Sequence, residues 1–169
     1  MHRALSPSLA LLMLSPAALV AQAPSWDGDY VLDLERSDKP VEAIRTATEP
    51  LNFALKPILR KKLEGSERPA QNLNLLKGSG VTLRIEKNLP FTAAPGSPAR
   101  WKRTDGEAFE VSMEDQAPGF ALSFRQDEVV RTQRFGLSED GRTLTLDVTL
   151  RHPKVPEPVR YKLVYRKAG

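Results

Sequence analysis

The sequence predicts a mainly β protein: an antiparallel up-and-down barrel of about 8–10 strands, with one kinked amphipathic helix after the first strand. Three observations support this. Apolar and polar residues alternate over most of the chain, short segments rich in turn-forming residues separate the alternating runs, and residues 40–64 carry an apolar stripe of helical period. Apolar residues make up 40% of the chain and charged residues 27%, as in an ordinary folded domain.

Period-two alternation gives each predicted strand one dry face and one wet face. The clearest case is Thr143–Arg151, where leucines and a valine alternate with threonines and charged residues. The alternating segments are 30–35, 81–86, 108–113, 120–125, 143–151 and 159–166. Strands with one apolar face either close into a barrel or pack as two sheets.

The connections carry residues that form tight turns. Gly78–Gly80, Asp105-Gly106 and Asp140-Gly141 each separate two predicted strands. An Asp-Gly pair supplies the positive φ that a tight hairpin needs. The order of strands and turns therefore favours an antiparallel meander.

The helix is predicted over residues 40–64. Pro40 suits a first turn and Gly65 a helix end. Pro50 and Pro57 fall opposite the apolar stripe, so they should bend the helix around the surface it covers. We expect it to lie across an opening or a flank of the barrel. The stripe consists of Val41, Ile44, Thr48, Leu51, Leu55, Ile58, Leu59 and Leu63.

The first 23 residues have the pattern of a cleavable signal peptide. Met1–Arg3 is basic, Ala4–Val20 is mostly apolar, and Ala21–Ala23 offers small residues where a signal peptidase cuts, before Pro24. The apolar run is short for a membrane span and contains two prolines. We therefore expect one domain at residues 24–169, periplasmic or secreted, without a membrane span.

Two segments resemble a known family. Gly28-Asp29-Tyr30 on the first strand and Arg160–Arg166 on the last make the chain look like the lipocalin-like (calycin) β-barrels, most of all small secreted bacterial members. The resemblance implies that Tyr30 stands where the family has an aromatic residue closing the barrel base. It also implies a basic residue from the last strand above that ring, either Arg160 or Arg166.

Composition argues against several functions. The chain has no cysteine, and its two histidines are His2 and His152, so thiol chemistry and histidine-rich metal sites are hard to build. The carboxylates from Glu107 to Asp115 are predicted to lie on the solvent-exposed face of a strand. The net charge of +4 is too small to indicate nucleic acid. We expect no enzyme, no cofactor and no bound metal.

A membrane-embedded β-barrel is the alternative fold, because its strands would fit this length. Such a barrel turns its apolar face outward. The amphipathic helix needs an apolar surface to cover, and the charged residues of the last strand lie opposite its aromatic ones. Both features favour a barrel with an apolar interior.

The strand Val129–Leu137 carries the best evidence for binding. If Phe135 and Leu137 point into the barrel, Arg131 and Gln133 do too. A buried arginine needs a carboxylate or an anionic ligand as its partner. A bulge or a register shift would instead turn Arg131 to solvent.

We therefore expect a non-catalytic, monomeric protein that binds a small apolar or amphipathic ligand, acids included, in a hollow barrel. The alternative is an envelope interaction module whose barrel is packed and holds no small molecule. Interior volume distinguishes the two. The residues expected to line the ligand site are Tyr30, Trp101, Phe109, Phe124, Arg131, Gln133 and Tyr161.

Overall fold

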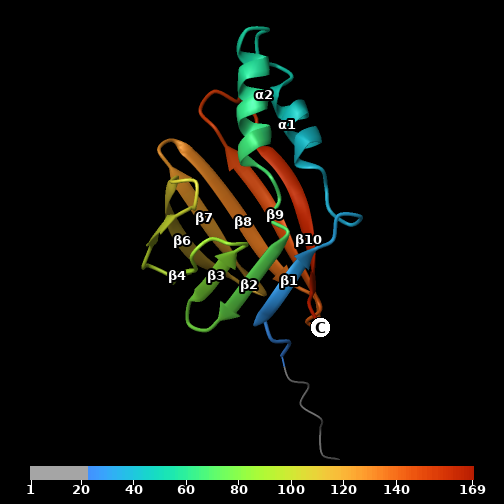
Figure 1. Cartoon of the computed structure of the whole chain (residues 1–169), viewed down its shortest axis with the longest axis vertical. Helices are drawn as coiled ribbons and strands as arrows, with labels where there is room; N and C mark the ends of the chain where they lie inside the picture. The colour runs from blue at the N-terminus through green and yellow to red at the C-terminus, as the bar shows by residue number, and fades with distance from the viewer. Residues whose placement is uncertain (1–22) are drawn as a thin grey trace, which may run out of the picture.

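The computed structural model describes residues 23–169, and in it ten strands form one antiparallel sheet that curls into a nearly closed barrel (Figure 1). The sheet order is β4-β3-β2-β1-β10-β9-β8-β7-β6-β5. The mainly β prediction is confirmed. The strands are β1 (Gly28–Leu32), β2 (Asn72–Lys77), β3 (Val81–Ile85), β4 (Phe91–Ala93), β5 (Ala99–Lys102), β6 (Ala108–Gln116), β7 (Gly119–Gln126), β8 (Val129–Leu137), β9 (Thr143–Arg151) and β10 (Val159–Lys167).

The two short strands β4 and β5 form the edges of the sheet, and the chain between them bridges the gap. Ala94 pairs with Ser97, and Pro95 makes a parallel bridge to Met113 on β6. The predicted hairpin turns are present as well. Gly106 and Gly141 adopt φ values of 95° and 69°, which an L side chain rarely accepts.

The apolar faces of the strands point inward, as the alternation predicts. On β9, Leu144, Leu146, Val148 and Leu150 are buried, whereas Asp147 between them is exposed. This parity holds because successive side chains of a strand leave on opposite faces. The inward residues therefore build one continuous core.

The barrel end at the start of β1 is packed with aromatic rings, and we call it the closed end. Trp26 lies 5.2 Å from Phe120, which stacks on Phe135 at 4.6 Å between ring centroids. Tyr30 is fully buried and donates its hydroxyl to the Trp26 carbonyl at 2.7 Å. These aromatic residues pack against one another, so their burial is explained without a ligand.

The basic residue over Tyr30 is Lys167, whose Nζ lies 5.8 Å from the ring centroid, so the expectation of Arg160 or Arg166 is wrong. The register explains the difference. Lys167 pairs directly with Tyr30, whereas Arg166 is one residue away and leaves on the other face. Arg166 instead contacts Asp33 at 3.2 Å, and Arg160 is exposed.

The helical segment forms two helices rather than one kinked helix: α1 (Pro40–Thr48) and α2 (Leu55–Ser66). Together they lie over the end of the barrel opposite the closed end (Figure 1). The side-chain oxygen of Asn52 accepts from the backbone N–H groups of Ala54 and Leu55, which begins α2. Pro57 falls in the first turn of α2, where its missing N–H costs nothing. Gly65 continues the helix instead of ending it.

The break changes which residues of the predicted stripe are buried. Ile44, Thr48, Leu59 and Leu63 are buried, but Ile58 is 65% exposed. Val41 and Leu55 are 41% and 37% exposed, and Leu51 is half-buried. The non-helical chain between α1 and α2 changes the direction in which later side chains point. One helical repeat of apolar residues therefore cannot describe the buried face of both helices.

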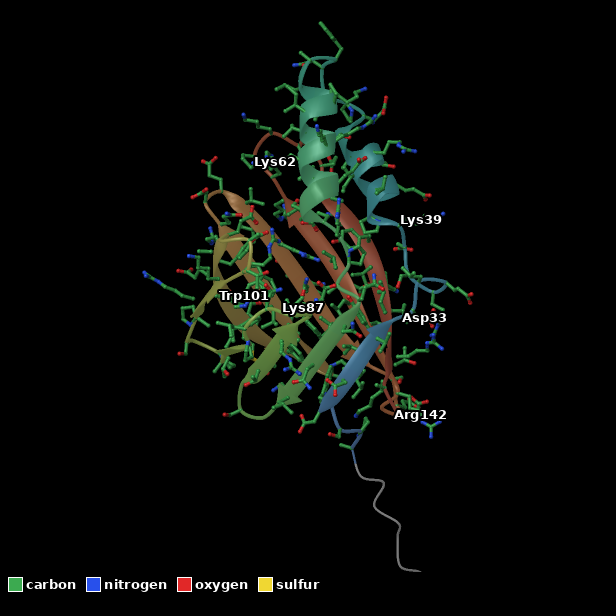
Figure 2. All side chains as sticks on the ribbon, viewed as in Figure 1. Asp33, Lys39, Lys62, Lys87, Trp101 and Arg142 are labelled. Atoms are coloured by element: carbon green, nitrogen blue, oxygen red, sulfur yellow. The ribbon has the colours of Figure 1, made fainter. Side chains whose placement is uncertain are left out.

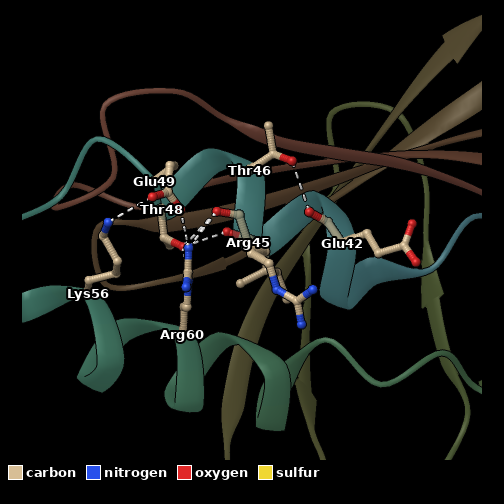
Figure 3. A network of polar contacts seen from close by, with 8 residues as sticks. Glu42, Arg45, Thr46, Thr48, Glu49, Lys56 and Arg60 are labelled. Carbon is tan, nitrogen blue, oxygen red and sulfur yellow. Dashed lines mark hydrogen bonds and ion pairs between the residues drawn. The ribbon is translucent and has the colours of Figure 1, made fainter.

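Arg60 of α2 holds the two helices together (Figure 3). Its guanidinium donates to the Thr48 hydroxyl at 2.8 Å, to the Arg45 carbonyl at 3.0 Å and to the Glu49 carboxylate at 2.6 Å. Lys56 adds a second contact to Glu49 at 3.1 Å. A cation suits this position, because the last carbonyls of α1 lack helical partners.

Between residues 23 and 169, no helix is long and apolar enough to cross a membrane. The predicted signal peptide lies outside the described residues, apart from Ala23.

Candidate ligand-binding cavity

A cavity of about 600 Å³ occupies the barrel under the end of α2. It is bounded by β2, β3 and β5–β10 and by the linker of residues 67–71 between α2 and β2. Its apolar wall consists of Leu73, Ile85, Trp101, Phe109, Phe124, Leu146 and Leu163. Small-molecule sites typically enclose about 300–1,000 Å³ and combine such a wall with a few polar groups.

Four aromatic rings form one side of this cavity or support it. Trp101 lies 5.3 Å from Phe91, 5.7 Å from Phe109 and 5.9 Å from Phe124. Figure 2 shows Trp101 on the flank of the barrel away from Asp33. The indole Nε1 of Trp101 donates to the Leu89 carbonyl at 2.9 Å, so its polar atom is satisfied by the protein. The cluster therefore presents an apolar surface to the cavity.

Arg131 points into the barrel. Its register is regular, opposite Phe124 on β7 and Leu150 on β9, so the alternative in which a bulge turns it outward is wrong. Its Nε lies 3.5 Å from the Glu67 carboxylate, and its Nη2 donates to the Tyr161 hydroxyl at 3.2 Å. Tyr161 in turn donates to Glu67 at 2.7 Å. We call Glu67, Arg131 and Tyr161 the buried triad.

Gln133 completes the surroundings of the triad. With its amide oxygen turned toward Arg131, it accepts from Nε at 3.2 Å and from Nη2 at 3.1 Å. This orientation satisfies both side chains, since an amide oxygen is an acceptor and a guanidinium carries only donors. Gln133 is buried and also lines the cavity.

Burial keeps the two tyrosines of this region neutral, because it raises the pKa of Tyr161 and of Tyr165 above the usual range. For Arg131, burial alone would lower the pKa. The charge of Glu67 and the hydrogen bond to the Tyr161 hydroxyl work in the opposite direction, and the pKa of Arg131 is raised. Arg131 therefore stays a cation, and Tyr161 stays a donor.

Hydrogen bonds to the barrel hold the linker of residues 67–71 in place over the cavity. The Tyr165 hydroxyl donates to the Ala70 carbonyl at 3.0 Å, and the Gln71 N–H donates to the Glu86 carboxylate at 2.8 Å. Glu67 caps α2 with its own N–H, which donates to the Leu63 carbonyl at 2.8 Å. These bonds set the place from which Glu67 reaches Arg131.

A second arginine lies at the rim of the cavity. Arg103 donates to Asp105 and to Glu107, each at 2.7 Å. The hydrogen bond to Asp105 is the main cause that raises the pKa of Arg103. Both Arg103 and Arg131 are therefore paired with carboxylates of the protein itself.

The structure brings together most of the residues that the sequence indicates for a site. Trp101, Phe109, Phe124, Arg131 and Gln133 line the cavity, and Tyr161 lies behind Arg131. Tyr30 does not line it, because the position of β1 in the sheet places this ring at the closed end. Sequence reasoning missed Glu67 and Tyr165 as residues of the site. Parity with Tyr161 could have found Tyr165, but nothing in the local sequence marks Glu67.

The residues weighed for catalysis are not grouped in the cavity. Glu110 and Glu114 are exposed on the outer face of β6. His152 lies in the loop after β9, and its Nδ1 accepts from the backbone of Lys154 at 3.1 Å. Within residues 23–169, no three histidine, aspartate or glutamate side chains are grouped so as to hold a metal ion.

Solved structures with the same fold include fatty-acid-binding proteins. A fatty-acid-binding protein of Schistosoma mansoni in complex with arachidonic acid is 15% identical, with a TM-score of 0.52 over 85% of this chain and 96% of that one. Fatty-acid-binding protein 1 of Echinococcus granulosus is 15% identical, with a TM-score of 0.53 over 84% and 96%.

A secretory abundant heat-soluble protein of Ramazzottius varieornatus is 12% identical, with a TM-score of 0.57 over 87% of this chain and 98% of that one. At such identities the likeness shows the fold alone, a nearly closed antiparallel β-barrel. No protein-family description matches the sequence, and no curated protein matches it either.

Proposed function

We propose that this protein binds one small apolar or amphipathic molecule inside its barrel and performs no catalysis. The observation that carries the proposal is the cavity of about 600 Å³ between the aromatic wall and Arg131. The apolar part of the ligand lies against Trp101, Phe109 and Phe124, and its polar end faces Arg131 and Gln133. The neighbours named as fatty-acid-binding proteins support this reading through the shared fold.

The competing proposal, a packed-barrel interaction module, requires a filled interior. Only the closed end is filled, by Trp26, Tyr30, Phe120 and Phe135. The other half of the barrel has room for a ligand, which favours binding over a purely structural barrel.

The two tryptophans of the chain offer a direct test, because Trp101 lines the cavity and Trp26 belongs to the closed end. Trp26→Phe leaves Trp101 as the only reporter, and Trp101→Phe leaves Trp26. We expect dodecanol, kept monomeric in solution, to change Trp101 emission saturably with one molecule bound per chain. Trp26 emission should change far less.

Two results would count against binding in this cavity. One is no saturable change in either single-tryptophan protein with any dodecyl compound. The other is an equal change in both, which would indicate a site elsewhere or general association with the ligand. Light scattering of the ligand alone serves as the control for droplets and other ligand aggregates.

We further propose that the protein is exported and acts as a monomer in the periplasm or outside the cell. The basic start, the apolar run and Ala21–Ala23 support export. N-terminal sequencing of the exported protein is expected to begin at or within a few residues of Pro24. An intact Met1 in that fraction would contradict it.

A further inference from the structure

We infer that Glu67 makes this cavity select ligands with an uncharged polar head, such as an alcohol, an ester or an amide, over ligands with a carboxylate. This inference rests on the proposed function. It begins from the charge of the site. An arginine inside an apolar barrel would be expected to attract an acid, but here the protein supplies the acid itself.

Glu67 is 5% exposed and contacts Arg131 directly, with Tyr161 hydrogen-bonded to both. The Arg131 side chain is 23% exposed, so part of it remains open to the cavity. Arg131 therefore presents its donors to a ligand, while the ion pair with Glu67 carries no net charge. A neutral oxygen can accept from the guanidinium and leave the ion pair intact.

A ligand carboxylate meets a different situation. Two carboxylates would share one buried guanidinium, and the extra negative charge would lie in a region of low polarity. The alternative is that Glu67 withdraws. Its backbone is held by the bond to Leu63 on one side and by the bond from Tyr165 to Ala70 on the other. Withdrawal of its side chain would give up the contact with Arg131 and the hydrogen bond from Tyr161.

The charged residues at the rim of the cavity do not reverse the preference for uncharged ligands. Arg103 is bonded to Asp105 and Glu107, and the exposed Arg68 at the mouth has the exposed Glu86 on the same rim. Attraction between charges in contact with water is weak, because the solvent screens them. The selectivity therefore depends on the pair inside the barrel.

The experiment compares dodecanol, methyl dodecanoate and dodecanoate at neutral pH, the two neutral compounds below their solubility limits and dodecanoate below its critical micelle concentration. The unchanged protein is expected to bind the two neutral compounds at least tenfold more tightly than the acid. Glu67→Gln should improve acid binding at least tenfold and change dodecanol binding less than threefold. Glutamine keeps an oxygen for the Tyr161 hydroxyl, removes the charge and carries an NH2 group in place of the second oxygen.

Glu64→Gln is the matched control, since it removes the same charge one helical turn earlier on α2, and the ratio of affinities should not change. The inference is overturned if the unchanged protein binds the acid as tightly as the alcohol, or if Glu67→Gln leaves the ratio as it was. If Glu67→Gln does not fold, the ligand series on the unchanged protein still decides. Failure of all three ligands to bind would overturn the proposed function itself.

Discussion

Arg131→Leu is expected to lower the free energy of unfolding by about 3–5 kcal/mol, the typical loss when one partner of a buried ion pair is removed. The leucine fits an apolar barrel, but the Glu67 carboxylate stays buried without its cation. Urea unfolding of the purified protein measures the effect. The midpoint should fall while the slope of the transition stays constant.

The double variant Arg131→Leu with Glu67→Gln tests the cause of that loss. It removes both charges and leaves an amide oxygen for the Tyr161 hydroxyl, so most of the stability should return. Arg134→Leu is the control on the same strand. Its side chain is exposed on the outer face, and the change should stay within about 0.5 kcal/mol. If the double variant is no more stable than Arg131→Leu, the triad is not held together by charge.

Leu59→Asp is expected to produce the second large loss. Leu59 is 5% exposed in α2, and removing a buried leucine side chain alone costs about 2–5 kcal/mol. The aspartate adds a buried charge with no cation provided for it. The loss should therefore be at least that of Leu59→Ala, measured by the same urea unfolding.

Ile58→Asp is the matched control, one residue away on the same helix. Because Ile58 is 65% exposed, its replacement should change the stability by no more than about 0.5 kcal/mol. A single continuous stripe through residues 40–64 predicts large losses at both positions. Equal losses would contradict the two-helix arrangement.

The strands could be predicted from the sequence because each is a local pattern. Alternation in Thr143–Arg151 determines which face is dry, and the turn residues at Asp140-Gly141 locate the hairpin. The same parity argument places Arg131 inside, since it shares a face with Phe135. It could not exclude a bulge, because a bulge depends on the pairing of two strands and not on one.

The helix boundaries and the polar half of the site could not be read in this way. Pro50 and Pro57 are compatible with kinks in one helix or with a break between two. The break is favoured by the packing of Arg60 against the end of α1 and by the Asn52 bonds that begin α2. Glu67 is a lone glutamate after a helix, without any periodicity. Its role depends on Tyr161 and Arg131, which lie more than sixty residues away in the sequence.

Native mass spectrometry tests the central claim, a barrel that holds one small molecule, most directly. Protein purified from its own compartment, or freed of lipid and incubated with dodecanol, is expected to carry a single adduct that disappears on denaturation. As the collision energy is raised, the adduct should be lost in a single step. The claim is contradicted if both preparations show only the mass of the polypeptide, without an adduct.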